Sequence, residues 1–189
     1  MLFRSLPATA TTVIDGWRID ASEIKLGKQI GAGNFGTVYR GEWNGMSVAI
    51  KQLHADVVSS AEKDAFTAEA ERMIHIKNHR NIVMLCGVCE IDGNLALVTE
   101  FCDGGSLDQA LYGKKPLIWK LDAQVSVAIG TSFGLQHLHH QNIIHRDVAA
   151  RNVLLDRHRT PKLTDFGMSR ANRGDEDDNT TQNRVGPLK

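Results

Sequence analysis

The sequence predicts an α+β fold in which a β-rich first part with one helix precedes a mainly helical second part. Up to residue 101, short β-branched and aromatic runs are separated by glycine-rich and turn-forming residues, which is typical of strands. Over residues 121–140, by contrast, apolar residues recur at helical spacing. Residues 1–16 are small and polar, and we expect a flexible lead-in there, before the first part begins at Trp17.

Four segments of the first part have strand character: residues 30–39, 47–53, 82–88 and 95–101. Asp92 and Gly93 form a strong turn signal between the last two segments. We expect a helix from Glu62 to Lys77, because this stretch contains neither Gly nor Pro. The sequence Ser-Ser-Ala-Glu at residues 59–62 also fits a capping box.

In the second part, the expected helix carries an apolar stripe of the kind that faces a core: Val125, Ala128, Ile129, Phe133, Leu135 and Leu138. Short apolar segments at 143–144, 153–155 and 162–163 predict short strands on this helical platform. Residues 171–184 are polar, with an acidic cluster at 175–178, and predict a mobile loop.

The composition excludes several classes of protein. With 42% hydrophobic and 23% charged residues, the chain resembles ordinary globular proteins. Its 22 basic and 22 acidic residues balance, so we expect no nucleic-acid partner. No apolar run reaches the roughly 18 residues of a membrane span, so we expect none in this chain. Three cysteines are too few and odd in number for a disulfide framework, which favours the reducing cytoplasm.

Residues 31–38 match the pattern G-x-G-x-x-G-x-V, whose glycines let backbone N–H groups approach phosphates. A glycine-rich hairpin without a ligand is the simpler interpretation of this pattern alone. A dinucleotide-binding turn would need a following helix and an acid about 20 residues on. Residues 37–40 favour a strand instead, and the residue 20 positions after Gly31 is Lys51. The dinucleotide interpretation therefore fails on both counts.

A lysine and a glutamate are candidates for a partly buried ion pair. Lys51 ends the apolar run Val-Ala-Ile-Lys and, taken alone, would simply extend into water. Glu69, however, shares one face of the expected helix with Phe66, Ala70 and Met73. A buried carboxylate needs a cation, and Lys51 is the nearest in sequence. Pairing would gain about 4 kcal/mol of Coulomb energy before desolvation, and would aim the ammonium at phosphate oxygens.

Two further motifs follow along the chain. His-Arg-Asp at residues 145–147 is followed by Asn152, in the pattern H-R-D-x-x-x-x-N, and Asp-Phe-Gly stands at residues 165–167. The ordered set of glycine loop, lysine, helical glutamate and these two motifs resembles the eukaryotic protein kinase family. The resemblance covers residues 17–189, nearly the whole chain.

This resemblance implies a two-lobed protein-kinase-like fold. A complete β-rich N-lobe with one αC-type helix would occupy residues 17–101. An incomplete helical C-lobe over residues 102–189 would hold the hinge, the catalytic loop and part of the activation segment. The implied function is an ATP-dependent protein kinase of signal transduction, which transfers the γ-phosphoryl group of Mg-ATP to a protein hydroxyl.

The resemblance also implies the site residues. Those that would bind ATP are Ile30, Gly31, Ala32, Gly33, Asn34, Phe35, Gly36, Thr37, Val38, Ala49, Lys51, Thr99, Glu100, Cys102 and Leu154. Asn152 and Asp165 would bind Mg²⁺, which needs few protein ligands. Asp147 would accept the substrate hydroxyl proton, and the other implied catalytic residues are Lys51, Glu69, Arg151 and Asn152. Four side chains would form the stacked regulatory spine of the family: Met73, Leu85, His145 and Phe166.

The acceptor hydroxyl stays open between two branches of the family. Serine/threonine kinases usually carry Lys two residues after the catalytic Asp, where this chain has Ala149. Arg151, four residues after that Asp, resembles the tyrosine-kinase form. The tyrosine-kinase-like group shares much of this pattern and often modifies Ser or Thr, so either Tyr or Ser/Thr could be the acceptor.

The resemblance implies regulation by phosphorylation as well. Arg146 would pair with a phosphate on the activation loop, for which Thr180 and Thr181 are the candidates. The implied partners are a protein substrate and either an upstream activating kinase or another kinase.

The sequence departs from the family pattern at its end. No A-P-E motif is present, and only Leu188 and Lys189 follow the last proline. We expect Val148, Val153 and Leu155 to lose burial without the helices that follow in the family, at about 1.5–3 kcal/mol for each large side chain. We therefore expect this 189-residue chain alone to be weakly active or inactive. The alternative function is a truncated, non-catalytic nucleotide-binding regulator that pairs with another kinase.

Two other patterns suggest metal or redox chemistry. Cys86 and Cys89 form a C-x-x-C pattern, but it lies in an expected strand and has no second pair. Three histidines, His137, His139 and His140, end the expected helix, where they suit the helix dipole. We expect a structural role for both groups.

Overall fold

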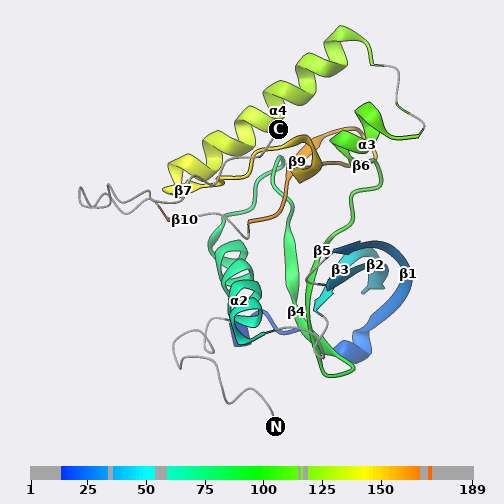
Figure 1. The fold of residues 1–189 in the computed structure, drawn as a ribbon, viewed down its shortest axis with the longest axis vertical. Helices are drawn as coiled ribbons and strands as arrows, with labels where there is room; N and C mark the ends of the chain where they lie inside the picture. The colour runs from blue at the N-terminus through cyan, green and yellow to red at the C-terminus, as the bar shows by residue number, and fades with distance from the viewer. Residues whose placement is uncertain are drawn as a thin grey trace.

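The computed structural model describes residues 14–33, 36–53, 59–114, 116, 119–166 and 170–171. Figure 1 shows the predicted division of the chain. Strands β1–β5 and helix α2 form one part, while helices α3 and α4 with the short later strands form the other. The mixed α+β class predicted from the sequence is therefore confirmed.

The first part is built on a five-stranded antiparallel sheet of order β1-β2-β3-β5-β4. Its strands are β1 (Ile24–Gly33), β2 (Gly36–Trp43), β3 (Met46–Leu53), β4 (Leu85–Ile91) and β5 (Asn94–Glu100). Two tight turns connect neighbouring strands through consecutive residues with positive φ. These residues are Asn44 (48°) with Gly45 (77°), and Asp92 (51°) with Gly93 (77°). The second turn is the Asp-Gly turn expected from the sequence.

The strand expected at residues 82–88 starts later, because β4 begins at Leu85. Ile82 and Val83 instead contact the second part of the molecule. The Val83 N–H donates to the Leu163 carbonyl (2.9 Å), and the Leu163 N–H donates to the Asn81 carbonyl (2.9 Å). This short parallel pairing ties the chain just before β4 to the helical part.

Helix α2 (Ser60–His75) packs its apolar face against the sheet. Phe66, Ala70 and Met73 are buried in one core cluster with Leu85 and Leu97 of the sheet. The helix lies within two residues of its expected bounds at each end, as is usual for helix ends assigned from sequence.

The structure describes residues 14–16 of the expected lead-in and places one of them, Ile14, in the core. Ile14 is only 5% exposed and belongs to the same core cluster as Phe66 and Met73 of α2. The residues directly after the expected lead-in are hydrogen-bonded to β4 through the backbone. The Ile19 N–H donates to the Val88 carbonyl (2.9 Å), and the Val88 N–H donates to the Trp17 carbonyl (2.8 Å). Val13 and Ile14 are two adjacent apolar residues in a polar stretch, and they show no periodicity, so sequence patterning could not place Ile14 in the core.

The second part combines helices with short strands. Its elements are β6 (Gly105–Ser106), α3 (Leu107–Tyr112), α4 (Leu121–His140), β7 (Ile143–Ile144), the 3₁₀ turn η2 (Ala150–Asn152), β8 (Val153–Leu155), β9 (Pro161–Leu163) and β10 (Arg170–Ala171). Another 3₁₀ turn, η1 (Ala21–Glu23), precedes β1. Strands β6, β8 and β9 form a small sheet, and β7 pairs with β10. No helix in the described ranges is long and apolar enough to cross a membrane.

The buried face of α4 differs from the predicted apolar stripe. Val125, Ile129 and Phe133 are 48%, 49% and 53% exposed. Leu138 of the predicted stripe is buried and Leu135 packs against the core, but the other buried residues of the helix, Val127, Gly130 and Gly134, were not in the stripe. A Cβ on Gly130 would lie 2.6 Å from Pro161, and one on Gly134 would lie 2.6 Å from the Asn81 carbonyl oxygen. These two glycines let the helix approach β9 closely, and a hydrophobic pattern does not register them.

The expected loss of burial occurs at only one of three positions. Val148 is 55% exposed, but Val153 and Leu155 are 3% and 0% exposed. Leu155 packs with Ala110 and Val127, while Val153 belongs to the main core cluster. The expectation is therefore wrong for Val153 and Leu155, because α3, α4 and β9 already cover them.

Candidate active site

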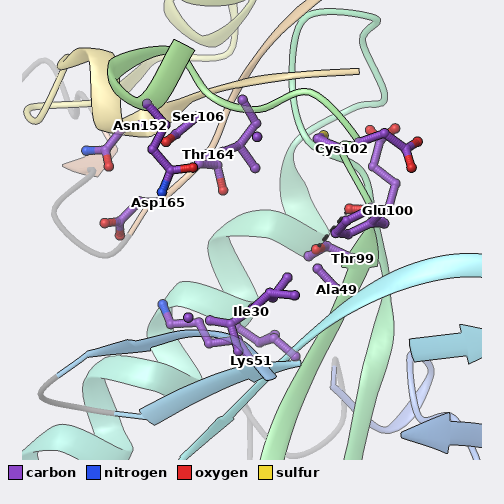
Figure 2. A pocket seen from close by; sticks show the side chains of 18 of the residues that line it. Ile30, Ala49, Lys51, Thr99, Glu100, Cys102, Ser106, Asn152, Thr164 and Asp165 are labelled. Carbon is purple, nitrogen blue, oxygen red and sulfur yellow. Dashed lines mark hydrogen bonds between the residues drawn. The ribbon is translucent and has the colours of Figure 1, made fainter. Parts of the chain in front are cut away.

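A cavity of about 450 Å³ lies between the sheet and the helical part. Its walls bring together most of the residues predicted for the site: Ile30, Gly31, Val38, Ala49, Lys51, Glu69, Thr99, Glu100, Cys102, Asn152, Leu154 and Asp165. Figure 2 shows Asn152, Thr164 and Asp165 on one side of this cavity, with Ile30, Ala49 and Lys51 across from them. Residues that are more than 100 positions apart thus face one space.

Part of the predicted glycine loop does not line the cavity. Ala32, Gly33, Gly36 and Thr37 belong to the end of the β1–β2 hairpin and are absent from the lining. Gly36 instead packs closely on the backbone of β3 at Gln52, and Thr37 is buried. The predictions for Asn34, Phe35, Thr180 and Thr181 lie outside the described residues.

Lys51 and Glu69 form the expected ion pair. The Lys51 Nζ lies 2.7 Å from Oε2 and 3.0 Å from Oε1 of Glu69. On β3, Val48 and Ile50 are fully buried on the opposite face, so strand alternation turns Lys51 toward the cavity. The Glu69 side chain is 9% exposed and that of Lys51 is 38% exposed. The ammonium is therefore held by a buried carboxylate while it remains accessible from the cavity.

A second ion pair fixes the segment that connects the two parts. Glu100, at the end of β5, accepts from the Lys162 Nζ (2.9 Å) and from the Met84 N–H (2.9 Å). The two side chains are 24% and 12% exposed. This pair joins the end of β5, where Glu100 lines the cavity, to β9. Lys162 was not predicted as part of the site, although a lysine within a short apolar strand is a signal for a buried partner.

Cys102 lines the cavity, but its thiol is unreactive near neutral pH. Burial, together with the nearby carboxylate of Glu100, raises the pKa of this thiol to about 12. The thiolate is the reactive form of cysteine, so Cys102 stays protonated and unreactive near neutral pH. Its contribution to the site is limited to shape and to its backbone groups.

Asp147 is held by two neighbours on the same loop. Arg151 donates to its Oδ1 (2.6 Å), and the Asn152 amide nitrogen donates to its Oδ2 (2.8 Å) and to its backbone carbonyl (2.9 Å). The 3₁₀ turn η2 carries both donors and thereby brings them back to Asp147. The carboxylate is therefore oriented from two sides.

His145 holds the same loop through contacts of both its ring nitrogens. Its Nε2 lies 3.0 Å from the Thr164 carbonyl, and the Asp147 N–H approaches its Nδ1 (3.4 Å). The two contacts are satisfied together by a neutral ring protonated at Nε2. His145 is fully buried, and its ring centroid lies 5.3 Å from that of Phe166. Met73, Leu85, His145 and Phe166, the four residues expected to form the stacked spine, are all buried.

The oxygen atoms near Asp165 fit a small divalent cation. Asn152 commits its amide nitrogen to Asp147, which leaves its amide oxygen as the acceptor. Asp165 and Asn152 line the same cavity, and Mg²⁺ prefers such oxygen ligands and needs few from protein. Among the described residues, no group of three or more His, Cys, Asp or Glu side chains is placed to hold a metal ion. The two oxygen donors of Asn152 and Asp165 are of the kind that Mg²⁺ prefers.

Of the two other patterns that suggested metal or redox chemistry, the cysteines lie in a strand and His137 makes contacts within the fold. Burial raises the pKa values of Cys86 and Cys89 to about 11, and both lie in β4. The His137 Nε2 lies 2.8 Å from the Lys77 carbonyl, and its ring stacks on that of His79 with centroids 4.6 Å apart. These contacts fix the loop after α2 against the end of α4.

Comparisons with known proteins agree with this geometry. The profile of the family described as protein tyrosine and serine/threonine kinase matches residues 24–189, and the chain belongs to this family of protein kinases. Serine/threonine-protein kinase STY17 of Arabidopsis thaliana is 36% identical over 168 residues, which are 87% of this chain and 29% of that protein. Tyrosine-protein kinase FRK of Homo sapiens is 36% identical over 166 residues, or 87% of this chain and 32% of that protein.

Spermatocyte protein spe-8 of Caenorhabditis elegans is also 36% identical, over 160 residues that make up 82% of this chain and 31% of that protein. The chain thus spans about 29–32% of the length of these three relatives. Within the family, the sheet with α2 is the N-lobe, and the helical part is a partial C-lobe.

Sequence reasoning missed several cavity residues: Leu97, Gly105, Ser106, Gln109 and Thr164. They come from β5, β6, α3 and the segment after β9, and they meet only through the fold. Thr164 directly precedes the Asp-Phe-Gly motif, which could have indicated it, whereas no chemical motif singles out the other four.

Proposed function

We propose that this cavity binds ATP and supports transfer of its γ-phosphoryl group to a hydroxyl of a protein. The observation that carries the proposal is that the Lys51–Glu69 pair, Asn152 and Asp165 line one cavity, while Asn152 also donates a hydrogen bond to Asp147, which is not itself in the lining. Family membership implies ATP use and a protein substrate.

In this proposal the walls of the cavity hold the nucleotide. The hinge backbone at Glu100 and Cys102 would pair with the adenine edge, between the apolar side chains of Val38, Ala49 and Leu154. The ammonium of Lys51 would bind the α- and β-phosphates, and Glu69 would keep it pointed at them. These contacts would bind and orient ATP without taking part in bond making.

The other side of the cavity would serve the reacting groups. Asn152 and Asp165 would hold Mg²⁺, which neutralises negative charge on the phosphate oxygens. Asp147 would accept a hydrogen bond from the substrate hydroxyl, and Arg151 would keep its carboxylate in place. Phosphoryl transfer passes through a loose transition state, so orientation of the hydroxyl matters more than the basicity of Asp147.

Regulation and location extend the proposal. Arg146, which is exposed beside Asp147, would receive a phosphate carried by Thr180 or Thr181. The lobe boundary would fall after residue 101, directly beyond β5. A cytoplasmic location stays a prediction, and cell fractionation would test it.

The test is a transfer assay with γ-labelled ATP and Mg²⁺. One set of peptides offers only tyrosine as acceptor and another offers only serine and threonine. Because the relatives carry both kinds of name, both sets are needed. With this 189-residue chain we expect at most weak label on one set, and its loss in Asp147→Asn. Nucleotide binding without transfer to either set would favour the non-catalytic regulator, and an Asp147→Asn variant as active as the wild type would refute the assigned role.

A further inference from the structure

Helix α2 contributes a second polar contact to the neighbourhood of the site, beside the one made by Glu69. The Arg72 Nε donates to the carbonyl oxygen of Phe166 (2.9 Å), which is 94 residues later in the chain. Burial lowers the pKa of Arg72, although the carboxylates of Glu69 and Glu71 act in the opposite direction. A guanidinium is thus partly desolvated to make this contact, and Phe166 is the residue directly after Asp165.

The backbone at Asp165 needs support from its surroundings. Its φ of 64° lies in the left-handed region, which is unfavourable for residues other than glycine and persists only where neighbours hold it. Before Asp165, the Thr164 N–H donates to the Asn152 carbonyl (3.0 Å) and the Thr164 carbonyl accepts from His145. The peptide on this side is therefore anchored to the C-lobe.

On the other side of Asp165, one anchor comes from the N-lobe. The Phe166 carbonyl accepts from Arg72, while the Phe166 side chain is fully buried in the core cluster that contains Met73. Arg72 and Met73 follow Glu69 by three and four residues, so they lie on the same side of α2. A movement of α2 that took Glu69 away from Lys51 would also take both contacts away from Phe166.

We infer that Arg72 is a positioning residue, which couples the placement of α2 to the conformation of Asp165 through the Phe166 carbonyl. Formation of the Lys51–Glu69 pair and preparation of the proposed Mg²⁺ ligand then occur together, because one rigid helix carries both contacts. This inference deepens the proposed function and rests on it. It links two parts of the same nucleotide site: Lys51, which would bind phosphate, and Asp165, which would bind Mg²⁺.

Two substitutions of equal length separate the hydrogen bond from charge and packing. In Gln the amide nitrogen is attached to Cδ, as Nε is in Arg, so Arg72→Gln keeps a donor at the same place. Arg72→Met places a methyl group there, so it matches Gln in length but has no donor. Both variants lose the positive charge, and Arg80→Met removes an exposed arginine as a matched control.

The measurement is the affinity for ATP, with Mg²⁺ and with a chelator, by titration calorimetry on the full chain. Mg²⁺ should raise the affinity of the wild type for ATP by a certain factor. We expect that factor to be about tenfold smaller in Arg72→Met, which is the loss expected for one charge-assisted hydrogen bond. We expect the affinity without Mg²⁺ to change by less than about twofold, since Lys51 and the hinge are untouched. Arg72→Gln should keep part of the gain, because its neutral N–H can still donate to the same carbonyl, and Arg80→Met should retain all of it.

The outcomes separate this inference from the proposed function. If the wild type does not bind ATP at all, the proposed function fails. If the wild type binds Mg-ATP and Arg72→Met keeps the full Mg²⁺ gain, the coupling is refuted. Equal losses in the Met and Gln variants would refute the hydrogen bond as its cause.

A second measurement covers the case in which Arg72→Met does not fold. Because coupling is reciprocal, Mg-ATP should slow amide hydrogen exchange in α2 of the wild type more than ATP with chelator does. Equal protection of α2 by both would overturn the inference without any substitution at Arg72.

Discussion

The ion pair between Lys51 and Glu69 allows a sharp test of how the cavity would bind phosphate. Glu69→Gln keeps the shape of the side chain and one acceptor oxygen but removes the charge. The Lys51 Nζ would lose one of its two carboxylate contacts, now 2.7 and 3.0 Å long, and the remaining one would be to a neutral group. The ammonium would then be free to turn toward water, because its side chain is 38% exposed.

The size of the effect follows from the burial of the pair. Two unit charges about 4 Å apart attract by about 4 kcal/mol at an effective dielectric of about 20. Desolvation of Glu69 and screening at the exposed side of Lys51 offset most of this attraction. We expect a net loss of about 1–2 kcal/mol in the grip on phosphate, which is a 5- to 30-fold weaker affinity for ATP.

The assay compares ATP with adenosine, which has the base and ribose but no phosphates. Titration calorimetry should give the expected loss for ATP and little change for adenosine, because the hinge is untouched. Glu71→Gln, two positions along the same helix, is the matched control and should bind both like the wild type. Equal weakening of ATP and adenosine, or an unchanged affinity for ATP, would refute the proposed role of the pair.

Three further predictions concern stability, measured by urea or thermal unfolding. Ile14→Ala should lower the free energy of unfolding by about 2–4 kcal/mol, since Ile14 is buried in the core, and a loss below about 0.5 kcal/mol would contradict its placement. Leu138→Ala should cost about 2–5 kcal/mol but Phe133→Ala less than about 1 kcal/mol, and the reverse order would contradict the observed face of α4. Burial and the cations around His79 lower its pKa, so the folded state binds a proton at His79 less well than the unfolded state does. The free energy of unfolding should therefore fall as the pH drops below about 6.5. The fall should be smaller in His79→Gln. Identical pH profiles would contradict the last of these.

The site could be predicted from the sequence where ordered motifs carry chemistry. The helical face shared by Glu69 with Phe66 and Met73 requires a cation, and Lys51 supplies it at hydrogen-bond distance. The Asp-Gly turn at residues 92–93 and the bounds of α4 likewise follow from local signals. Local rules succeed here because each depends on residues close together in the chain.

The features that sequence reasoning missed depend on contacts between distant segments. Two glycines, Gly130 and Gly134, decide which face of α4 is buried, because they admit Pro161 and the Asn81 backbone. Hydrophobic periodicity ignores these glycines and counts the exposed Phe133 as a core residue. The burial of Ile14 and the contact of Arg72 with Phe166 likewise involve partners that no local pattern indicates.

The most direct test of the central claim is whether the cavity binds one ATP per chain through Lys51. Titration calorimetry in the presence of Mg²⁺ should give a single site for the wild type, and Lys51→Met should bind at least about tenfold more weakly. The exposed Lys63→Met on α2 is the control and should bind like the wild type. Absence of ATP binding by the folded wild type, or undiminished binding by Lys51→Met, would contradict the account.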